Sequence, residues 1–151
     1  YTIANEEWTR AMTKLQSHSA SHPTSFVQYA CARALQDSQA SMTAVGSMLA
    51  EYERRRDWLI PQLNAIRGFK CAMPEGAFYA FVDVREMLGD EFKTSADVAD
   101  KMLSECQIVA TDGKPFGAEG FIRLSYATSM QNLENAIERL RNLFGTSSMS
   151  A

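Results

Sequence analysis

The sequence predicts an α/β sandwich: a small, partly antiparallel sheet of three to four strands with helices packed on it, preceded by a long helix. Two observations carry this prediction. Apolar residues recur at helical spacing over 5–16, 24–66, 94–106 and again after residue 128. Between these stretches lie short runs whose side chains point alternately to opposite faces, as in strands. With 151 residues and 46% apolar content, the chain is long enough for one domain with its own core.

Composition excludes several classes of protein. The formal net charge of -3 argues against nucleic acid or an anionic membrane as the main partner. No apolar run approaches the roughly 20 residues that span a bilayer. The three cysteines are widely spaced and odd in number, which favours reduced thiols in a cytoplasmic protein. The chain begins at Tyr1 and enters a helical pattern at once, so we expect it to be a piece of a longer protein.

The first 66 residues have helical patterns. Asn5 is placed to cap a helix over 5–16, and the helical run over 24–66 is expected to break or bend at residues 37–41, DSQAS. Charged residues crowd positions 51–57. A solvated helix face with ion pairs between neighbouring turns is the favoured interpretation, and a basic binding patch is the alternative.

Residues 17–25 are rich in serine and are predicted to form a loop or a helix start. Their Ser and Thr side chains are more typical of helix caps than of a binding site. His18 and His22 are four residues apart, but a zinc site would need a third ligand and a helix beneath both. A metal site is therefore disfavoured here.

Four extended runs follow. Residues 70–73 and 108–111 are short, whereas 77–84 and 120–127 are longer, and turn residues at 74–76 precede the second run. In 77–84 apolar residues alternate on both faces, which predicts a strand that is mostly covered on both sides.

Two further helices complete the pattern. The first runs from Thr94 or Ser95 to Cys106, with Leu103 among its inward residues. The second starts at Thr128 or Ser129, with Gln131 placed for a capping box, and stops at Gly145. The tail, residues 146–151, is predicted to be disordered.

Arg123 stands in the middle of the run 120–127 and shares one face with Phe121 and Ser125. An arginine there is costly to bury without an anion, and no acidic residue lies beside it. A carboxylate supplied by a ligand would suit the planar guanidinium, which can bond both oxygens. The alternative is a stem that packs on the sheet and a head group in solvent.

Four motifs in order now show a family resemblance. They are HPTSFVQYACARAL, MPEGAFYAFVDV, FGAEGFIRLSYATS and NLENAIERLRNLF. Together they resemble the C-terminal third of class I, fold type I, pyridoxal-phosphate-dependent aminotransferases, most closely the bacterial aspartate aminotransferase branch. The resemblance covers about residues 1–144.

The resemblance implies roles for several residues. The arginine of FIRLSYA binds the substrate α-carboxylate in this family, which carries over to Arg123. Gly76 and Phe78 match positions near the active-site mouth. Ser21, His22 and Pro23 match a loop that approaches the partner subunit's active site in a homodimer, although relatives usually carry asparagine where this chain has His22.

The resemblance also implies what lies elsewhere. In relatives, the lysine that binds the cofactor covalently, the aspartate that pairs with its ring nitrogen and the stacking aromatic belong to the large domain, upstream of this chain. None of the chain's five lysines matches that motif. We therefore expect pyridoxal phosphate in the full-length protein and not in this piece, which should be inactive alone.

The expected organisation follows. Residues 1–23 are a helix and connecting loop from the large domain, 24–145 are the small domain, and 146–151 are the tail. The full-length enzyme would transfer an amino group between an amino acid, with aspartate as a guess, and a 2-oxo acid. Two alternatives stay open: a free-standing α/β module that binds a small carboxylate, in a binding or regulatory role, and a fold type I enzyme of another kind, such as a lyase.

Overall fold

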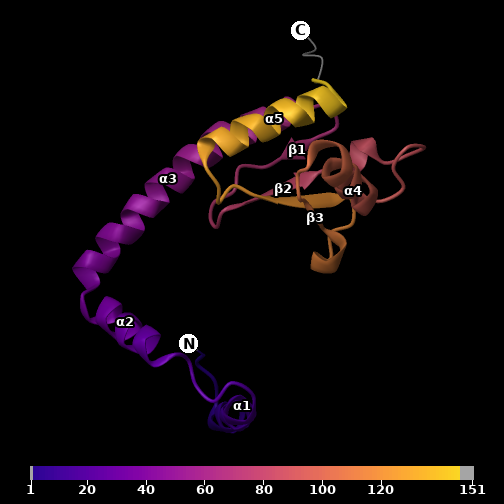
Figure 1. The fold of residues 1–151 in the computed structure, drawn as a ribbon. Coiled ribbons are helices and arrows are strands. Elements are labelled where there is room, and N and C mark those ends of the chain that lie inside the picture. The colour runs from indigo at the N-terminus through magenta and orange to yellow at the C-terminus, as the bar shows by residue number, and fades with distance from the viewer. Residues whose placement is uncertain (1, 147–151) are drawn as a thin grey trace. The chain divides into compact units, whose positions relative to one another are not determined.

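The structure is a computed structural model that describes residues 2–146 (Figure 1). The chain divides into two compact units, residues 1–47 and 48–151. The division into 1–23, 24–145 and 146–151 stays a prediction, and residues 147–151 of the expected tail lie outside the described residues.

The first unit is helical. It contains α1 (Glu6–Ser19), α2 (Ser25–Gln36) and the start of α3 (Ser38–Asn64). The side chain of Asn5 accepts a hydrogen bond from Trp8 N at 2.9 Å, which confirms the predicted cap. The break between α2 and α3 at Asp37 confirms the predicted interruption. Residues 17–19 were wrongly placed in a loop, because their backbone continues α1.

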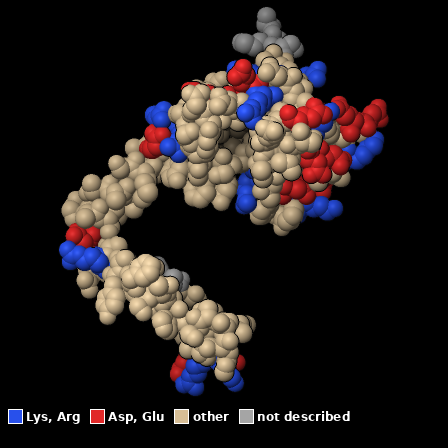
Figure 2. Space-filling view, in the orientation of Figure 1, with Lys and Arg blue, Asp and Glu red and all other residues tan. Residues whose placement is uncertain are grey.

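The apolar side chains of this unit have no cover among the described residues. No residue of α1 or α2 is buried, and Trp8, Phe26, Tyr29 and Leu35 are 63–79% exposed. Charged residues are sparse along α2 and the start of α3, as Figure 2 shows. These helices therefore carry amphipathic patterns whose apolar sides face solvent.

The second unit is built on a four-stranded sheet. Its strands are β1 (Lys70–Cys71), β2 (Tyr79–Asp83), β3 (Thr111–Asp112) and β4 (Phe121–Ser125), in the order β1-β2-β4-β3 with every neighbouring pair antiparallel. Two short 3-10 turns, η1 (Arg85–Met87) and η2 (Lys114–Phe116), and two helices, α4 (Ser95–Cys106) and α5 (Met130–Phe144), complete it. This confirms the predicted α/β architecture.

One face of the sheet forms the core. Ala80, Val82 and Ile122 are fully buried, and Leu124 is 8% exposed. They pack in one cluster with residues from the end of α3, from α4 and from α5, namely Leu59, Leu63, Val98, Met102, Leu133, Ile137 and Leu140. Because strand residues alternate in direction, the residues between them point to the opposite face. That face carries Tyr79, Phe81, Asp83, Phe121 and Arg123, and we call it the outer face.

Two strand predictions are wrong. The outer face of β2 is open, with Phe81 37% exposed, because no helix of the described residues covers it. Residues 108–110 are not a strand, and Val109 is 76% exposed. The chain there is still closing the end of α4: Gln107 adopts a left-handed conformation, and Ile108 N donates to Met102 O.

The helix ends correct two further predictions. Leu103 is 52% exposed and points out of the core. Ser129 caps α5 by accepting from Asn132 N, so Asn132 and not Gln131 holds the third helical position. In residues 51–57 the predicted ion pairs are confirmed, since Glu51 accepts hydrogen bonds from Arg54 and Arg55, which lower the pKa of Glu51 to about 2. The predicted solvated face is only partly right, because the side chains of Arg55 and Arg56 are 19% and 22% exposed.

The side chain of Asn64 completes the open edge of β1. Its Oδ1 accepts from Cys71 N at 2.7 Å, and its Nδ2 donates to Cys71 O at 3.0 Å. The amide therefore replaces a neighbouring strand and joins the end of α3 to the sheet.

We expect Asn64→Ala to lower the free energy of unfolding by about 1–2 kcal/mol, because both backbone groups of Cys71 lose their partner. Urea unfolding of the 151-residue chain measures this. Asn135→Ala is the control, since Asn135 only accepts from Gln131 of its own helix. Equal effects of the two substitutions would contradict the role of the Asn64 amide.

Candidate functional site

Arg123 lies at the centre of the outer face. It sits in the middle of β4, opposite Phe81 of β2 and Thr111 of β3. Its neighbours along the strand, Ile122 and Leu124, are buried in the core, so β4 is fixed and the arginine side chain points the other way. Its half-buried position agrees with the sequence expectation of a strand arginine.

Two aromatic rings enclose the guanidinium. Its Cζ atom lies 4.4 Å from the ring centre of Tyr79 and 4.5 Å from that of Phe116. Both contacts are within the range of a cation–π interaction.

No described residue neutralises Arg123. Ten ion pairs occur in residues 2–146, and none includes Arg123; its side chain also makes no hydrogen bond within that range. A half-buried guanidinium without an acid is an open position for an anionic ligand.

Arg85 provides a contrast on the same face. Its Cζ lies 5.1 Å from the ring centre of Phe121, so it too stacks on an aromatic ring. Unlike Arg123, it makes two hydrogen bonds to the carboxylate of Asp83, at 2.9 and 2.6 Å. The Arg85 guanidinium lowers the pKa of Asp83 below its ordinary value. Arg85 is thus paired with a carboxylate of the same chain, whereas Arg123 has no acidic partner among residues 2–146.

The loop before β4 carries Phe116 to Arg123. Gly113 makes the loop tight, because a Cβ atom there would lie 2.4 Å from Ala118 O and 2.6 Å from Phe121 O. Phe116 stands on η2 within this loop and is half exposed. Sequence reasoning did not single out Phe116, since its role depends on a loop conformation and not on a spacing.

Phe78 joins the site through Tyr79. The two rings have centres 4.6 Å apart, and Phe78 also contacts the ring of Tyr52 at 5.7 Å. Gly76 lies in the bend before β2 and has open space where a Cβ would be. The left-handed residue of this bend is Ala77, with φ 60°, so Gly76 is not required there by backbone conformation.

Ser21, His22 and Pro23 belong to the first unit. Ser21 has φ 60°, and the carbonyl of Pro23 lies 2.7 Å from His22 Nδ1 and accepts from Gln28 Nε2. These bonds define a turn between α1 and α2. The second unit, by contrast, brings Arg123 and Phe78 together by itself.

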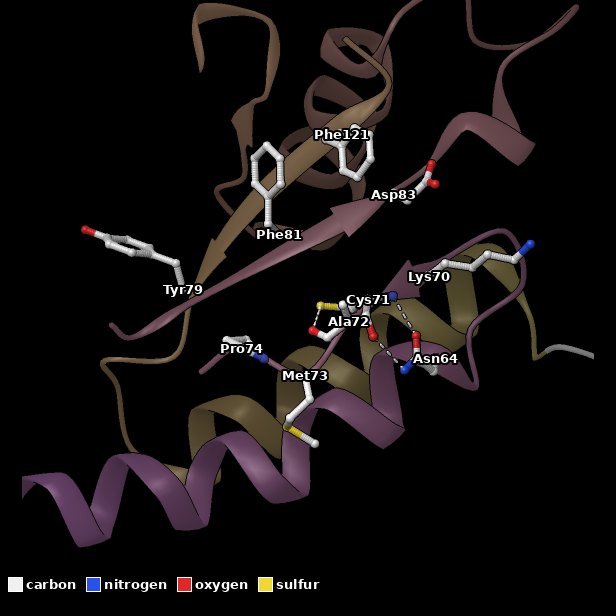
Figure 3. A pocket seen from close by; sticks show the side chains of 10 residues that line it. All are labelled: Asn64, Lys70, Cys71, Ala72, Met73, Pro74, Tyr79, Phe81, Asp83 and Phe121. Carbon is white, nitrogen blue, oxygen red and sulfur yellow. Dashed lines mark hydrogen bonds between the residues drawn. The ribbon is translucent and has the colours of Figure 1, made fainter. Parts of the chain in front are cut away.

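A groove of about 560 Å³ lies next to the Arg123 site, at the outer face. Figure 3 shows the side chains that line this groove. Tyr79 is common to both: it stacks on Arg123 and lines the groove. The stacked rings of Phe81 and Phe121, with centres 5.1 Å apart, form another wall. The outer face is therefore aromatic along its length, with Arg123 among the rings.

Two kinds of feature are absent from residues 2–146. No group of three or more His, Cys, Asp or Glu side chains is arranged to hold a metal ion. Of the helices described there, none is long and apolar enough to cross a membrane.

The Asp83–Arg85 pair makes stability depend on pH. Because the pKa of Asp83 is lowered in the folded state, the pair stabilises the fold fully above the unfolded value of 3.8, and this contribution is lost as the pH falls through the folded value. We expect Asp83→Asn to cost up to about 1 kcal/mol at pH 6 and less at pH 3. Denaturant unfolding at both pH values tests this, with Asp100→Asn, an exposed aspartate of α4, as control. A cost at pH 3 equal to that at pH 6 would contradict it.

Comparison with known proteins now gives the family. The sequence profile described as "Aminotransferase class I and II" matches residues 1–140. The chain is 39% identical over 140 residues to an aspartate/prephenate aminotransferase of Nitrosomonas europaea, covering 88% of this chain and 34% of that protein.

Solved structures agree. The aromatic aminotransferase of Pyrococcus horikoshii OT3 superposes with a TM-score of 0.80 at 38% identity, over 93% of this chain and 37% of that one. The aspartate aminotransferase of Thermus thermophilus with maleate superposes with a TM-score of 0.78 at 35% identity, over 91% of this chain and 34% of that one. The chain spans about a third of the length of the relatives it matches. By its profile, its identity to these relatives and its fold, this chain belongs to the class I and II aminotransferase family.

Proposed function

We propose that the full-length protein containing this chain is an aminotransferase in which Arg123 binds the α-carboxylate of the substrate. The observation that carries this proposal is the guanidinium of Arg123, stacked between two rings and paired with no acid of the described residues. A substrate carboxylate supplies the anion that the fold leaves out.

The geometry suits this role. The rings of Tyr79 and Phe116 lie 4.4 and 4.5 Å from the guanidinium carbon, and we propose that these contacts help to hold the guanidinium in place for the ligand. A carboxylate can then accept two parallel hydrogen bonds, which fixes both the position and the direction of the substrate. Orientation of this kind is a large part of catalysis, because the entropy of alignment is lost on binding and not in the reaction.

Pyridoxal phosphate enters this proposal as the cofactor of the full-length protein. The residues described here do not form its site. Lys70, Lys101 and Lys114 lie in surface ion pairs, Lys93 donates to Gly89 O, and Lys14 is exposed on α1. No lysine of residues 2–146 lies at Arg123, so no step of the reaction is assigned to a lysine of this chain.

Substrate and partners follow from the relatives. Those above are named for aspartate, prephenate and aromatic amino acids. We therefore propose an amino acid and a 2-oxo acid as substrates, with aspartate the first donor to test. The exposed apolar side chains of α1 and α2 support contact with the rest of the protein and with a second subunit of a homodimer, in which Ser21, His22 and Pro23 lie near the partner's site. Three free cysteines support a cytoplasmic location.

In the full-length protein, we expect Arg123→Lys to lower kcat/KM by roughly one to three orders of magnitude and to raise KM. Lysine keeps the charge but loses the two-point bond and the stacking. Steady-state transamination with aspartate and with phenylalanine measures the effect.

Arg85→Lys is the matched control, because Arg85 stacks on the same face but is already paired with Asp83. Its kcat/KM should stay within about twofold of the wild type. Wild-type kinetics for Arg123→Lys with both substrates would remove Arg123 from the site. A full-length protein that releases ammonia and transfers no amino group would be a lyase.

A second experiment separates the chain from the whole protein. We expect the 151-residue chain mixed with pyridoxal phosphate to show no stoichiometric shift of the cofactor's absorbance, because none of its five lysines matches the motif of the cofactor-binding lysine. The full-length protein should show one. A shift of equal size in both samples would place the cofactor site in this chain.

A further inference from the structure

We infer that Ser95 of α4 is a positioning residue for substrate binding, which acts by holding the loop that presses Phe116 onto Arg123. The inference rests on the proposed function for its kinetic consequence, but its structural part can be tested alone. It assigns to α4, a helix whose other buried residues serve the core, a part in shaping the carboxylate site.

Ser95 is unusual among the residues described. It is fully buried, and among residues 2–146 it is the one buried residue with a polar or charged side chain. It stands at the first position of α4, where the capping box formed by Thr94 and Asp97 fixes the backbone. Its position is therefore set by the helix start and not by the loop that it contacts.

The hydroxyl of Ser95 holds both ends of one loop. It donates to Asp112 Oδ1 at 2.7 Å, just before the loop, and accepts from Gly120 N at 3.1 Å, just after it. Glu119 Oε1 lies 3.2 Å from the same hydroxyl and accepts from Ser95 N at 3.4 Å. The Ser95 side chain thus joins the base of residues 113–119 to α4, beside the β3–β4 pairing of Asp112 with Ile122 that also closes this base.

Backbone hydrogen bonds also hold the loop of residues 113–119 in one conformation. Gly113 N donates to Phe121 O at 2.8 Å, and the amides of Phe116 and Ala118 donate to Gly113 O at 2.9 and 3.1 Å. With its ends fixed and its interior bonded, the loop backbone holds Phe116 beside β4, where its ring lies against Arg123. Loss of the Ser95 bonds would free the loop from α4 and leave the guanidinium with one ring, Tyr79.

A double-mutant cycle on the full-length protein tests the pathway. We expect Ser95→Ala to raise KM for the amino acid roughly threefold to tenfold and to leave kcat within about twofold of the wild type. The reason is that the hydrogen bonds of Ser95 to the loop affect substrate binding and not the chemical step. In a Phe116→Ala background, the same change should raise KM by less than about twofold, since the element through which Ser95 acts is gone. A serine that only stabilises the fold would give the same factor in both backgrounds, and that result would overturn the inference.

Two controls sharpen the cycle. Ser104→Ala removes an exposed hydroxyl of the same helix that only donates to Lys101 O, so KM should not change. Asp112→Asn keeps the oxygen that accepts from Ser95 and should resemble the wild type, whereas Asp112→Ala should resemble Ser95→Ala. If Ser95→Ala fails to fold, the two Asp112 variants decide the cycle in its place.

Hydrogen exchange of the segment 113–121 is the readout that does not need activity. In Ser95→Ala we expect its amides to exchange at least about tenfold faster, with α5 unchanged; in Ser104→Ala neither should change. Unchanged exchange in the loop would overturn the inference. If exchange is faster in Ser95→Ala but the full-length protein transfers no amino group, the structural role of Ser95 is supported and the proposed function is contradicted.

Discussion

The candidate site depends on one arrangement in the second unit: a guanidinium that contacts two rings and pairs with no acid of residues 2–146. Arg123 needs a strand whose core side is fixed, which Ile122 and Leu124 provide, and two rings at matched distances, which β2 and the loop before β4 provide. Each ring comes from a different part of the chain. The site is thus a product of the sheet's register and of one loop, and no single segment contains it.

The two faces of the sheet differ in burial. The core face is covered by the end of α3, by α4 and by α5, and its burial supplies most of the stability. The outer face is left half exposed and aromatic, which costs stability in this chain but makes the face available to ligand and to the rest of the protein. A fourth helix over this face would bury these rings and cover the proposed carboxylate site.

The sequence predicted much of this fold and part of the site. Amphipathic spacing predicted four helical runs, of which the longest, 24–66, divides into α2 and α3 at the predicted break. The charge of Arg123 in an apolar strand left a ligand site and a packed stem as equal alternatives until the family motifs were considered. The opening of the outer face could not be predicted, because Tyr79 and Phe81 are as apolar as core residues. Phe116 and Ser95 were missed since their roles arise from contacts between distant segments, 113–119 with β4 and α4 with the loop. The predictions for Leu103 and Gln131 were each wrong by one helical position, because sequence patterns place helix ends and buried faces only to within one or two residues.

Arg85 and Arg123 show why local sequence could not separate an arginine with an internal partner from the one proposed to bind a ligand. Both lie on the outer face and both stack on an aromatic ring. Stacking therefore does not identify a binding arginine, and neither does the face on which it lies. The difference is Asp83, two residues from Arg85, which satisfies one guanidinium from within the chain. The residues directly opposite Arg123 on β2 and β3 are Phe81 and Thr111, and neither is acidic. An acid at either of these positions would occupy the guanidinium and compete with a carboxylate ligand, so the uncharged neighbours are as much part of the binding site as the arginine itself.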